Sequence, residues 1–149
     1  MKNKDFTEYL KMSPDELRKL QWKNGWALSL VGLVVYAILR LFGQKPKSYH
    51  GICPYFEIGY FWGGLEMGWF FICDKTSTDS VKMHEVGHGI QNAAVGGLTM
   101  IVYCIGSAIR YWWRELFGSV TDYDDWFFEG DATRIGTEYV QFFKNKNEE

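Results

Sequence analysis

The chain has 149 residues, of which 47% are hydrophobic and 18% aromatic, enough for one compact domain and one additional element but not for two full domains. Sixteen Lys and Arg residues against 18 Asp and Glu residues give a net charge of −2, which leaves no excess basic charge to neutralise nucleic-acid phosphates. We therefore expect no nucleic-acid partner. Three cysteines are too few for a disulfide scaffold.

Residues 1–24 contain six Lys or Arg and four Asp or Glu, and they are predicted to form a solvated arm. Within it, Ser13 followed by Pro14 is typical of the start of a short helix, since serine caps the first turn and proline suits its first position.

Residues 25–43 are predicted to form a membrane anchor helix. The run at 26–42, WALSLVGLVVYAILRLF, has Arg40 as its single charge and reaches roughly 25 Å as a helix, near the short limit for crossing a bilayer. A central buried helix of a soluble domain is the alternative. More Lys and Arg residues precede this run than follow it, which favours a single-pass protein with a cytosolic N-terminus and the rest of the chain outside the cytosol. Unpaired cysteines would favour the opposite side.

The aromatic segment 53–73, CPYFEIGYFWGGLEMGWFFIC, predicts two strands around a tight turn at Gly63-Gly64. Such a hairpin would bring Cys53 and Cys73 near its open end. A cross-strand disulfide and two free thiols both remain open.

Three helices are predicted after the hairpin, over residues 81–94, 98–113 and 126–143, with a polar tail at 144–149. The middle helix is apolar, yet its small and polar residues fall within one arc of about 100°. We therefore expect it to pack on the domain or lie at the membrane interface rather than to span. The residues of this arc are Thr99, Tyr103, Gly106, Ser107, Arg110 and Arg114. The expected fold is an α+β domain over residues 49–143.

Residues 84–88 read H-E-V-G-H, an H-E-x-x-H pattern on the first of these helices. Residues four apart on a helix differ by only about 40° in direction, so both imidazoles can reach one metal ion. Zinc lowers the pKa of a bound water to about 7, and an adjacent glutamate can take its proton. We predict His84 and His88 as zinc ligands and Glu85 as the catalytic base. The alternative is that both histidines are ordinary polar residues of a half-exposed helix.

A catalytic zinc site keeps three protein ligands and one open position. Glu129 is the predicted third ligand, because it lies at the edge of the apolar face of the last helix, where a carboxylate needs a cation partner. A rim carboxylate that contacts water or an arginine is the alternative. Asp125 and Asp131 are weaker candidates, and His50 is expected to be solvent-exposed.

The segment HEVGHGIQN, with WFFEGDA following it, resembles the zincin metallopeptidases of the gluzincin branch. In that family a helical HExxH supplies two zinc ligands and a glutamate on a later helix supplies the third. The resemblance implies His84, His88 and Glu129 as zinc ligands and Glu85 as the base. It covers residues 53–143 and implies a zincin-like minimal domain of a small sheet, the HExxH helix, a packed apolar helix and the Glu-bearing helix.

The resemblance also implies an active-site sheet whose edge strand, at residues 65–72, pairs with an extended peptide substrate. Small bacterial membrane-associated peptidases have a similar order of strand, HExxH and EG, which implies the bacterial cell membrane as the location. Tyr123 and Tyr139 are the candidates for stabilising the oxyanion.

The sequence thus predicts a membrane-anchored zinc peptidase with a peptide or protein as its substrate and membrane lipid as a further partner. Two alternatives remain open. The first is an intramembrane zinc protease, against which stand Asp74, Lys75, Asp79 and Lys82 just before the motif, because charges are costly inside a bilayer. The second is a non-catalytic membrane protein whose structural zinc site is closed by a fourth ligand.

Overall fold

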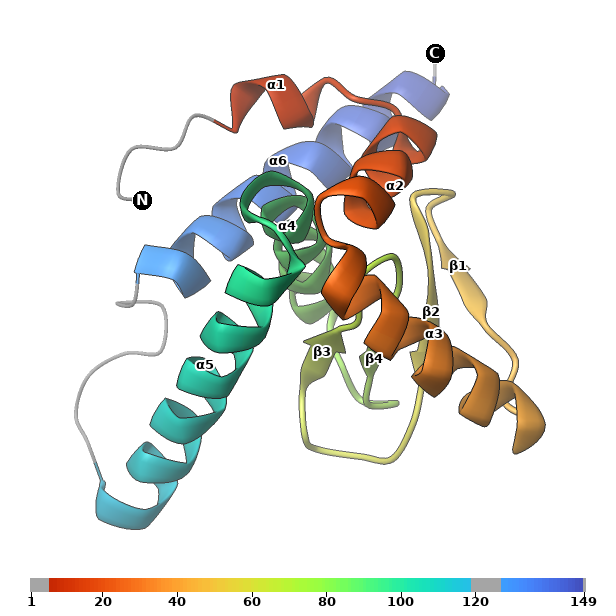
Figure 1. Ribbon diagram of the computed structural model, residues 1–149. Coiled ribbons are helices and arrows are strands. Elements are labelled where there is room, and N and C mark those ends of the chain that lie inside the picture. Colours follow the sequence, from red (N-terminus) through yellow and green to blue (C-terminus); the bar gives the residue numbers. More distant parts are fainter. Residues whose placement is uncertain (1–5, 119–126, 149) are drawn as a thin grey trace.

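The computed structural model describes residues 6–118 and 127–148 (Figure 1). The predicted α+β class is confirmed by a small mixed sheet and helices on either side of it in the chain. The elements are α1 (Thr7–Leu10), α2 (Pro14–Lys23), α3 (Trp26–Leu41), β1 (Lys47–Tyr49), β2 (Cys53–Glu57), β3 (Gly64–Glu66), β4 (Phe71–Cys73), α4 (Asp79–Val95), α5 (Gly97–Phe117) and α6 (Phe127–Glu148).

The four strands lie in the order β1-β2-β4-β3, so β3 forms one edge of the sheet. β2 and β4 run parallel, whereas β3 pairs antiparallel with β4. The predicted hairpin is therefore wrong, because the segments before and after Gly63-Gly64 pair in parallel, through β2 and β4, and not as antiparallel arms of one turn. The reversal comes later, between β3 and β4, where Met67 N–H donates to the Phe70 carbonyl over 2.9 Å. The strand predicted at 65–72 is split by this turn into β3 and β4.

A buried carboxylate explains why the chain does not turn back at the glycine pair. Asp74 accepts hydrogen bonds from the backbone N–H groups of Trp62 (3.1 Å) and Gly63 (2.7 Å), which are thereby used in a loop rather than in a hairpin turn. The parallel register places Cys73 opposite Glu57 instead of Cys53. All three cysteines are free thiols, so the disulfide alternative is excluded.

Helix α4 lies in the middle of the molecule and contacts α2, α5, α6 and the sheet (Figure 1). It crosses α6 at very short range, because a Cβ on Gly87 would overlap the carbonyl oxygen of Ala132, and a Cβ on Gly136 would overlap that of Met83. The apolar face predicted for the last helix is confirmed, since Ala132, Ile135, Gly136, Tyr139, Val140 and Phe143 are all buried.

The N-terminal segment is not the solvated arm that the sequence predicted. Ser13 does begin α2 with a reciprocal capping box to Glu16. However, Leu17 and Gln21 on the opposite side of α2 are buried against α4, and the Gln21 amide donates to the Gly89 carbonyl over 3.0 Å. The end of the last helix also differs from the prediction, because α6 continues through the polar tail to Glu148.

Helix α3 corresponds to the predicted membrane anchor, but it has two different sides. Val35, Tyr36 and Leu39 pack on the sheet, while much of the other side is exposed. Among the described residues, no single helix combines the length and hydropathy needed to cross a bilayer. Helices α2 and α3 taken together have the required length and hydropathy, but the chain bends by 104° between them. The prediction of one spanning helix over residues 25–43 is thus not borne out.

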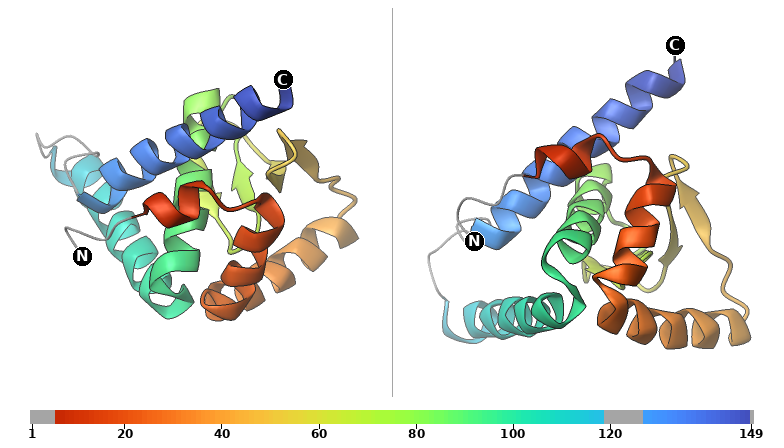
Figure 2. Two further views of the ribbon diagram at one scale, coloured as in Figure 1. Left: turned by 90° about the horizontal axis from the view of Figure 1, so that it is seen from above. Right: turned by 45° about the horizontal axis from the view of Figure 1, so that its top comes forward.

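Helices α3 and α5 begin at the same place and diverge along one edge of the molecule (Figure 2, right). Gly97 N–H donates to the Asn24 carbonyl over 3.2 Å, and a Cβ on Gly97 would lie 2.7 Å from the carbonyl oxygen of Gly25. One side of α5 packs into the molecule through Met100, which contacts Phe128. This confirms the expectation that the second apolar helix packs on the domain.

Candidate metal centre

Three of the predicted site residues converge. α4 places His84 and His88 one turn apart on the same side, and the first turn of α6 carries Glu129 towards them. The Nε2 atoms of both histidines lie 3.2 Å from Oε2 of Glu129. The Glu129 side chain is only 1% exposed, so its charge has been removed almost completely from water. Such a carboxylate needs a compensating cation or proton nearby.

The spacing of these atoms is compatible with a tetrahedrally coordinated metal ion. Ligand atoms about 2.1 Å from a tetrahedral centre lie about 3.4 Å from one another. The two Nε2–Oε2 distances of 3.2 Å come close to this value, and the candidate ligand atoms all lie within 4.8 Å of one another. The residues present therefore fit a metal with two imidazoles and one carboxylate as ligands.

Hydrogen bonds orient the ring of His84 towards this point. Its Nδ1 lies 2.9 Å from Oγ1 of Thr133, and that hydroxyl donates its proton to the Glu129 carbonyl over 3.3 Å. The Thr133 oxygen can therefore only accept from Nδ1. A proton on Nδ1 leaves the lone pair of Nε2 available to a metal.

His88 is oriented in the same way by Gln91. The amide nitrogen of Gln91 donates to the Phe128 carbonyl over 2.8 Å, which turns its oxygen towards Nδ1 of His88, also at 2.8 Å. Nδ1 is then the protonated nitrogen and Nε2 faces the metal position. Gln91 and Phe128 thereby connect the HExxH helix to the start of α6, close to the third ligand.

Without a metal ion, hydrogen bonds hold the two histidines and Glu129 together. Burial disfavours a charged His88, but the hydrogen bonds to Glu129 and Gln91 and the charges of Glu85 and Glu129 together outweigh it and raise the pKa of His88 to about 9. Burial likewise disfavours a charged Glu129, and hydrogen bonds from His84, His88 and Ser107 hold its pKa well below the usual range. The carboxylate is therefore ionised and ready to bind a cation.

Glu85 lies next to the cluster and points to the strand side of α4. Its carboxylate accepts a hydrogen bond from the backbone N–H of Glu66, and a Cβ on Gly64 would lie 2.6 Å from its Oε1. Burial raises the pKa of Glu85, against the opposing effect of both imidazoles. The lack of a side chain at position 64 leaves room for this carboxylate between β3 and α4.

The cluster opens into a cleft of about 430 Å³. β3 and Trp62 form one wall, and Tyr103 and Ser107 of α5 form the other. The predicted polar arc of the middle helix thus contributes to the cleft through these two residues, while the side chains of Arg110 and Arg114 lie outside the described ones.

Three residues that contribute to this site were missed by sequence reasoning: Glu66, Gln91 and Thr133. Gln91 follows His88 by three residues on the same helix face, so the helical spacing could have revealed it. Thr133 lies one turn beyond Glu129 and could have been found in the same way. No pattern in the sequence indicated that Glu66 is buried, because its burial depends on the unexpected turn after β3.

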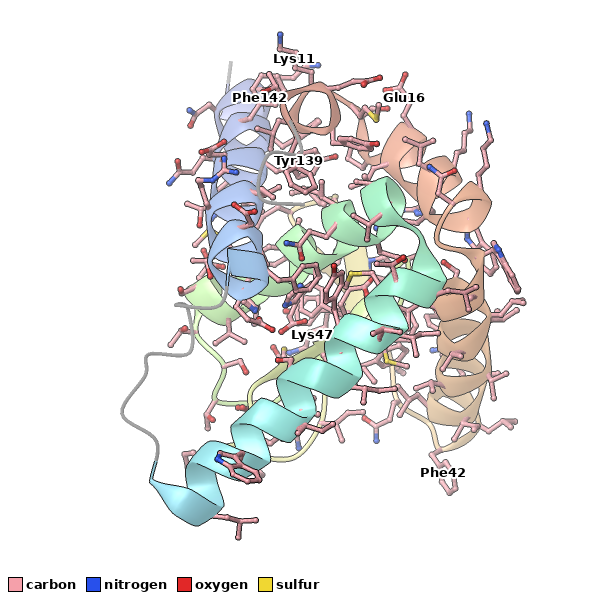
Figure 3. The ribbon with its side chains drawn as sticks, turned by 60° about the vertical axis from the view of Figure 1, so that its left-hand side comes forward. Lys11, Glu16, Phe42, Lys47, Tyr139 and Phe142 are labelled. Atoms are coloured by element: carbon pink, nitrogen blue, oxygen red, sulfur yellow. The ribbon has the colours of Figure 1, made fainter. Side chains whose placement is uncertain are left out.

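The remaining candidates that the structure describes do not join the cluster. Asp131 pairs with Arg134 over 3.3 Å, and His50 is exposed as expected. The hydroxyl of Tyr139 donates to the Met12 carbonyl over 3.0 Å in the interior (Figure 3), which excludes it from the cleft. Asp125 and Tyr123 lie outside the described residues.

Comparisons with family models, curated proteins and solved structures give no match. The description of this site therefore rests on the chain's own geometry.

Proposed function

We propose that the protein is a zinc-dependent hydrolase that cleaves peptide bonds, with His84, His88 and Glu129 as metal ligands. The observation that carries this proposal is the combination of three possible ligand atoms within 4.8 Å of one another with a buried glutamate, Glu85, beside them and a cleft in front of them. A purely structural site would have a fourth protein ligand. Among the described residues, the group of possible ligands contains only these three.

A bound zinc ion would supply a polarised water with a pKa near 7 and a positive charge next to the substrate carbonyl. Glu85 would accept the proton of the attacking water and pass it to the leaving amine. The raised pKa of Glu85 suits both steps, because a general base and acid works best when its pKa lies near the working pH.

The edge of the sheet supports a peptide as the substrate. β3 lies at the end of the strand order and forms one wall of the cleft, with Leu65 half-exposed. An extended peptide can add to such an edge by backbone hydrogen bonds and bring a scissile bond to the metal. This edge is β3 alone, shorter than the strand predicted at residues 65–72.

The decisive experiment compares the native protein with Glu85→Gln and His88→Ala in metal content and in cleavage of a mixed peptide library. We expect about one zinc per chain in the native protein and in Glu85→Gln, no zinc in His88→Ala, and cleavage only by the native protein. His50→Ala is the matched control and should keep both zinc and cleavage. Full cleavage by Glu85→Gln would refute the mechanism, and zinc bound without any cleavage would indicate a non-catalytic site.

A further inference from the structure

Helix α5 has two opposite faces with different roles. Tyr103, Ser107 and their neighbours line the cleft, whereas a stripe of apolar side chains points the other way, about 180° around the helix. The stripe residues are between 56% and 72% exposed: Leu98, Val102, Ile105, Ile109, Trp113 and Leu116. α5 is therefore a wall between the cleft and an exposed apolar surface.

Helix α3 has a matching stripe on the side that faces away from the sheet. Its residues are between 45% and 86% exposed: Trp26, Leu30, Val34, Ile38 and Leu41. Helices α3 and α5 begin together and run along one edge of the molecule, with the other elements to one side of them (Figure 2, right). Since the stripes are exposed on the sides of these helices that face away from the sheet and the cleft, we treat them as one surface. We name these eleven residues the apolar base. Exposed apolar patches of this extent mark interaction surfaces.

The charges around the apolar base favour an anionic partner. Residues 17–56 contain six Lys or Arg and no Asp or Glu, and the sequence of α5 contains two Arg residues and one acidic residue, Glu115. The basic side chains Lys23, Arg40 and Lys45 are exposed near the two ends of α3. Basic residues that border an apolar, tryptophan-containing helix face are typical of helices that lie in the surface of an anionic bilayer.

The chemistry of the apolar base also distinguishes a bilayer from a second copy of the chain. Protein interfaces carry about one hydrogen bond per 100–200 Å², which requires polar groups among the apolar ones. Nine of the eleven residues of the apolar base are aliphatic and offer no side-chain hydrogen bond. A hydrocarbon layer is a partner that requires no hydrogen bonds from the protein.

We propose that α3 and α5 lie in the surface of an anionic bilayer through the apolar base, and that the cleft receives peptide segments held at that surface. Among the described elements that line the cleft, only α5 also carries part of the apolar base. A helix is about 10 Å thick with its side chains. The α5 wall of the cleft is therefore about one helix diameter from the membrane. The substrate assignment rests on the proposed hydrolysis, whereas the bilayer attachment does not.

The attachment is tested by flotation of the full chain with vesicles. The inactive Glu85→Gln protein is used throughout, so the result does not depend on catalysis. It should bind vesicles that contain phosphatidylglycerol and bind vesicles of phosphatidylcholine alone more weakly. The double variant Val34→Glu/Val102→Glu should lose binding by about tenfold or more, because carboxylates do not enter the apolar layer. Val34 and Val102 are 60% and 66% exposed, so neither change creates a cavity.

The matched control is Phe142→Glu, which adds the same charge at an exposed apolar residue far from the base, as the positions of Phe42 and Phe142 show (Figure 3). It should bind vesicles like the parent. Failure of the parent to bind, or equal binding by the double variant, would overturn the proposal. A stable dimer that the double variant dissociates, without vesicle binding, would assign the base to a second copy instead.

The substrate class is tested with one fluorogenic peptide, free in solution or coupled to a lipid headgroup in the same vesicles. The native protein should cleave the coupled peptide at least about tenfold faster, because attachment raises the local concentration of the peptide. Equal rates would refute the surface substrate while leaving attachment intact. Cleavage of neither peptide, together with normal flotation, would count against the hydrolytic function alone.

Discussion

Gln91 links the orientation of one histidine to the backbone of α6. Its amide is fixed at both ends, by Nδ1 of His88 and by the Phe128 carbonyl, each at 2.8 Å. Replacing it with leucine keeps most of the volume but leaves Nδ1 without this acceptor. Loss of such a partner to a metal-binding histidine lowers affinity by about 10- to 100-fold.

We therefore expect Gln91→Leu to weaken zinc binding by that factor, measured by competition with a fluorescent chelator. Gln141→Leu, the same change at an exposed position of α6, is the control and should bind zinc like the native protein. Unchanged affinity in Gln91→Leu would show that the orientation of His88 does not depend on this amide.

Glu66 makes the stability of the protein depend on pH. It is only 3% exposed; Oε1 accepts the Gly68 N–H at 2.7 Å, and Oε2 has no partner among the described residues. Burial raises the pKa of Glu66 from 4.5 to about 8, despite the opposing charge of His88. Between these two values the folded protein keeps a proton that the unfolded chain has released. The free energy of unfolding must then fall as pH rises from about 4.5 to about 8.

Glu66→Gln removes this titration and keeps the shape of the side chain. We expect it to be more stable than the native protein at pH 8, by a few kcal/mol, and nearly equal to it at pH 4.5. Urea unfolding at pH 4.5, 6.5 and 8 measures the difference, with the exposed Glu138→Gln as control. A native-minus-variant difference that is constant with pH would mean that the pKa of Glu66 is the same in the folded and the unfolded chain.

At the scale of the elements, the site depends on the close crossing of α4 and α6. Gly87 lies within the HExxH motif, where glycine costs about 1 kcal/mol of helix propensity relative to alanine. The crossing explains its presence, since the carbonyl of Ala132 occupies the space of a Cβ. Only this approach lets Glu129 reach both histidines.

Gly87→Ala should therefore destabilise the protein by about 1–3 kcal/mol, although propensity alone predicts a gain. It should also weaken zinc binding, because it separates the helices that carry the ligands. Gly89→Ala is the comparison: its Cβ would meet the end of the Gln21 side chain at 2.9 Å, which can move, so its loss should be smaller. Urea unfolding and chelator competition measure both effects. Equal stability losses in the two variants would show that the crossing tolerates a methyl group.

Helices and sheet differ in how far the sequence predicts them. The three C-terminal helices follow from their periodicity and caps, and so does the apolar face of α6 with Glu129 at its edge. The sheet topology was not predicted, because a run of aromatic residues favours strands but does not show at which residue the chain reverses. What decides the topology is Asp74, whose hydrogen bonds to the Trp62 and Gly63 backbone form only in the folded chain.

At the scale of the whole molecule, the motif predicted the site better than it predicted its surroundings. His84, Glu85 and His88 follow from the pattern, and Glu129 from its position at the edge of an apolar face. The burial of α2 was missed because its polar composition conceals Leu17 and Gln21, whose partners on α4 lie about 70 residues away, as the 68-residue separation of Gln21 and Gly89 illustrates. Long-range contacts of this kind leave no local pattern.

The backbone contact between Gly25 and Gly97 joins two bent helix pairs at a single point. α2 and α3 form one bent arm, α4 and α5 the other, and the two bends touch backbone to backbone. We therefore expect that a change in the angle between α3 and α5 also changes the angle between α5 and α4, and with it the width of the cleft. Gly97→Ala would force the bends apart. We expect its KM for peptides to change several-fold while its zinc content, set by α4 and α6, stays at the native value; a native KM would show that the bends move independently.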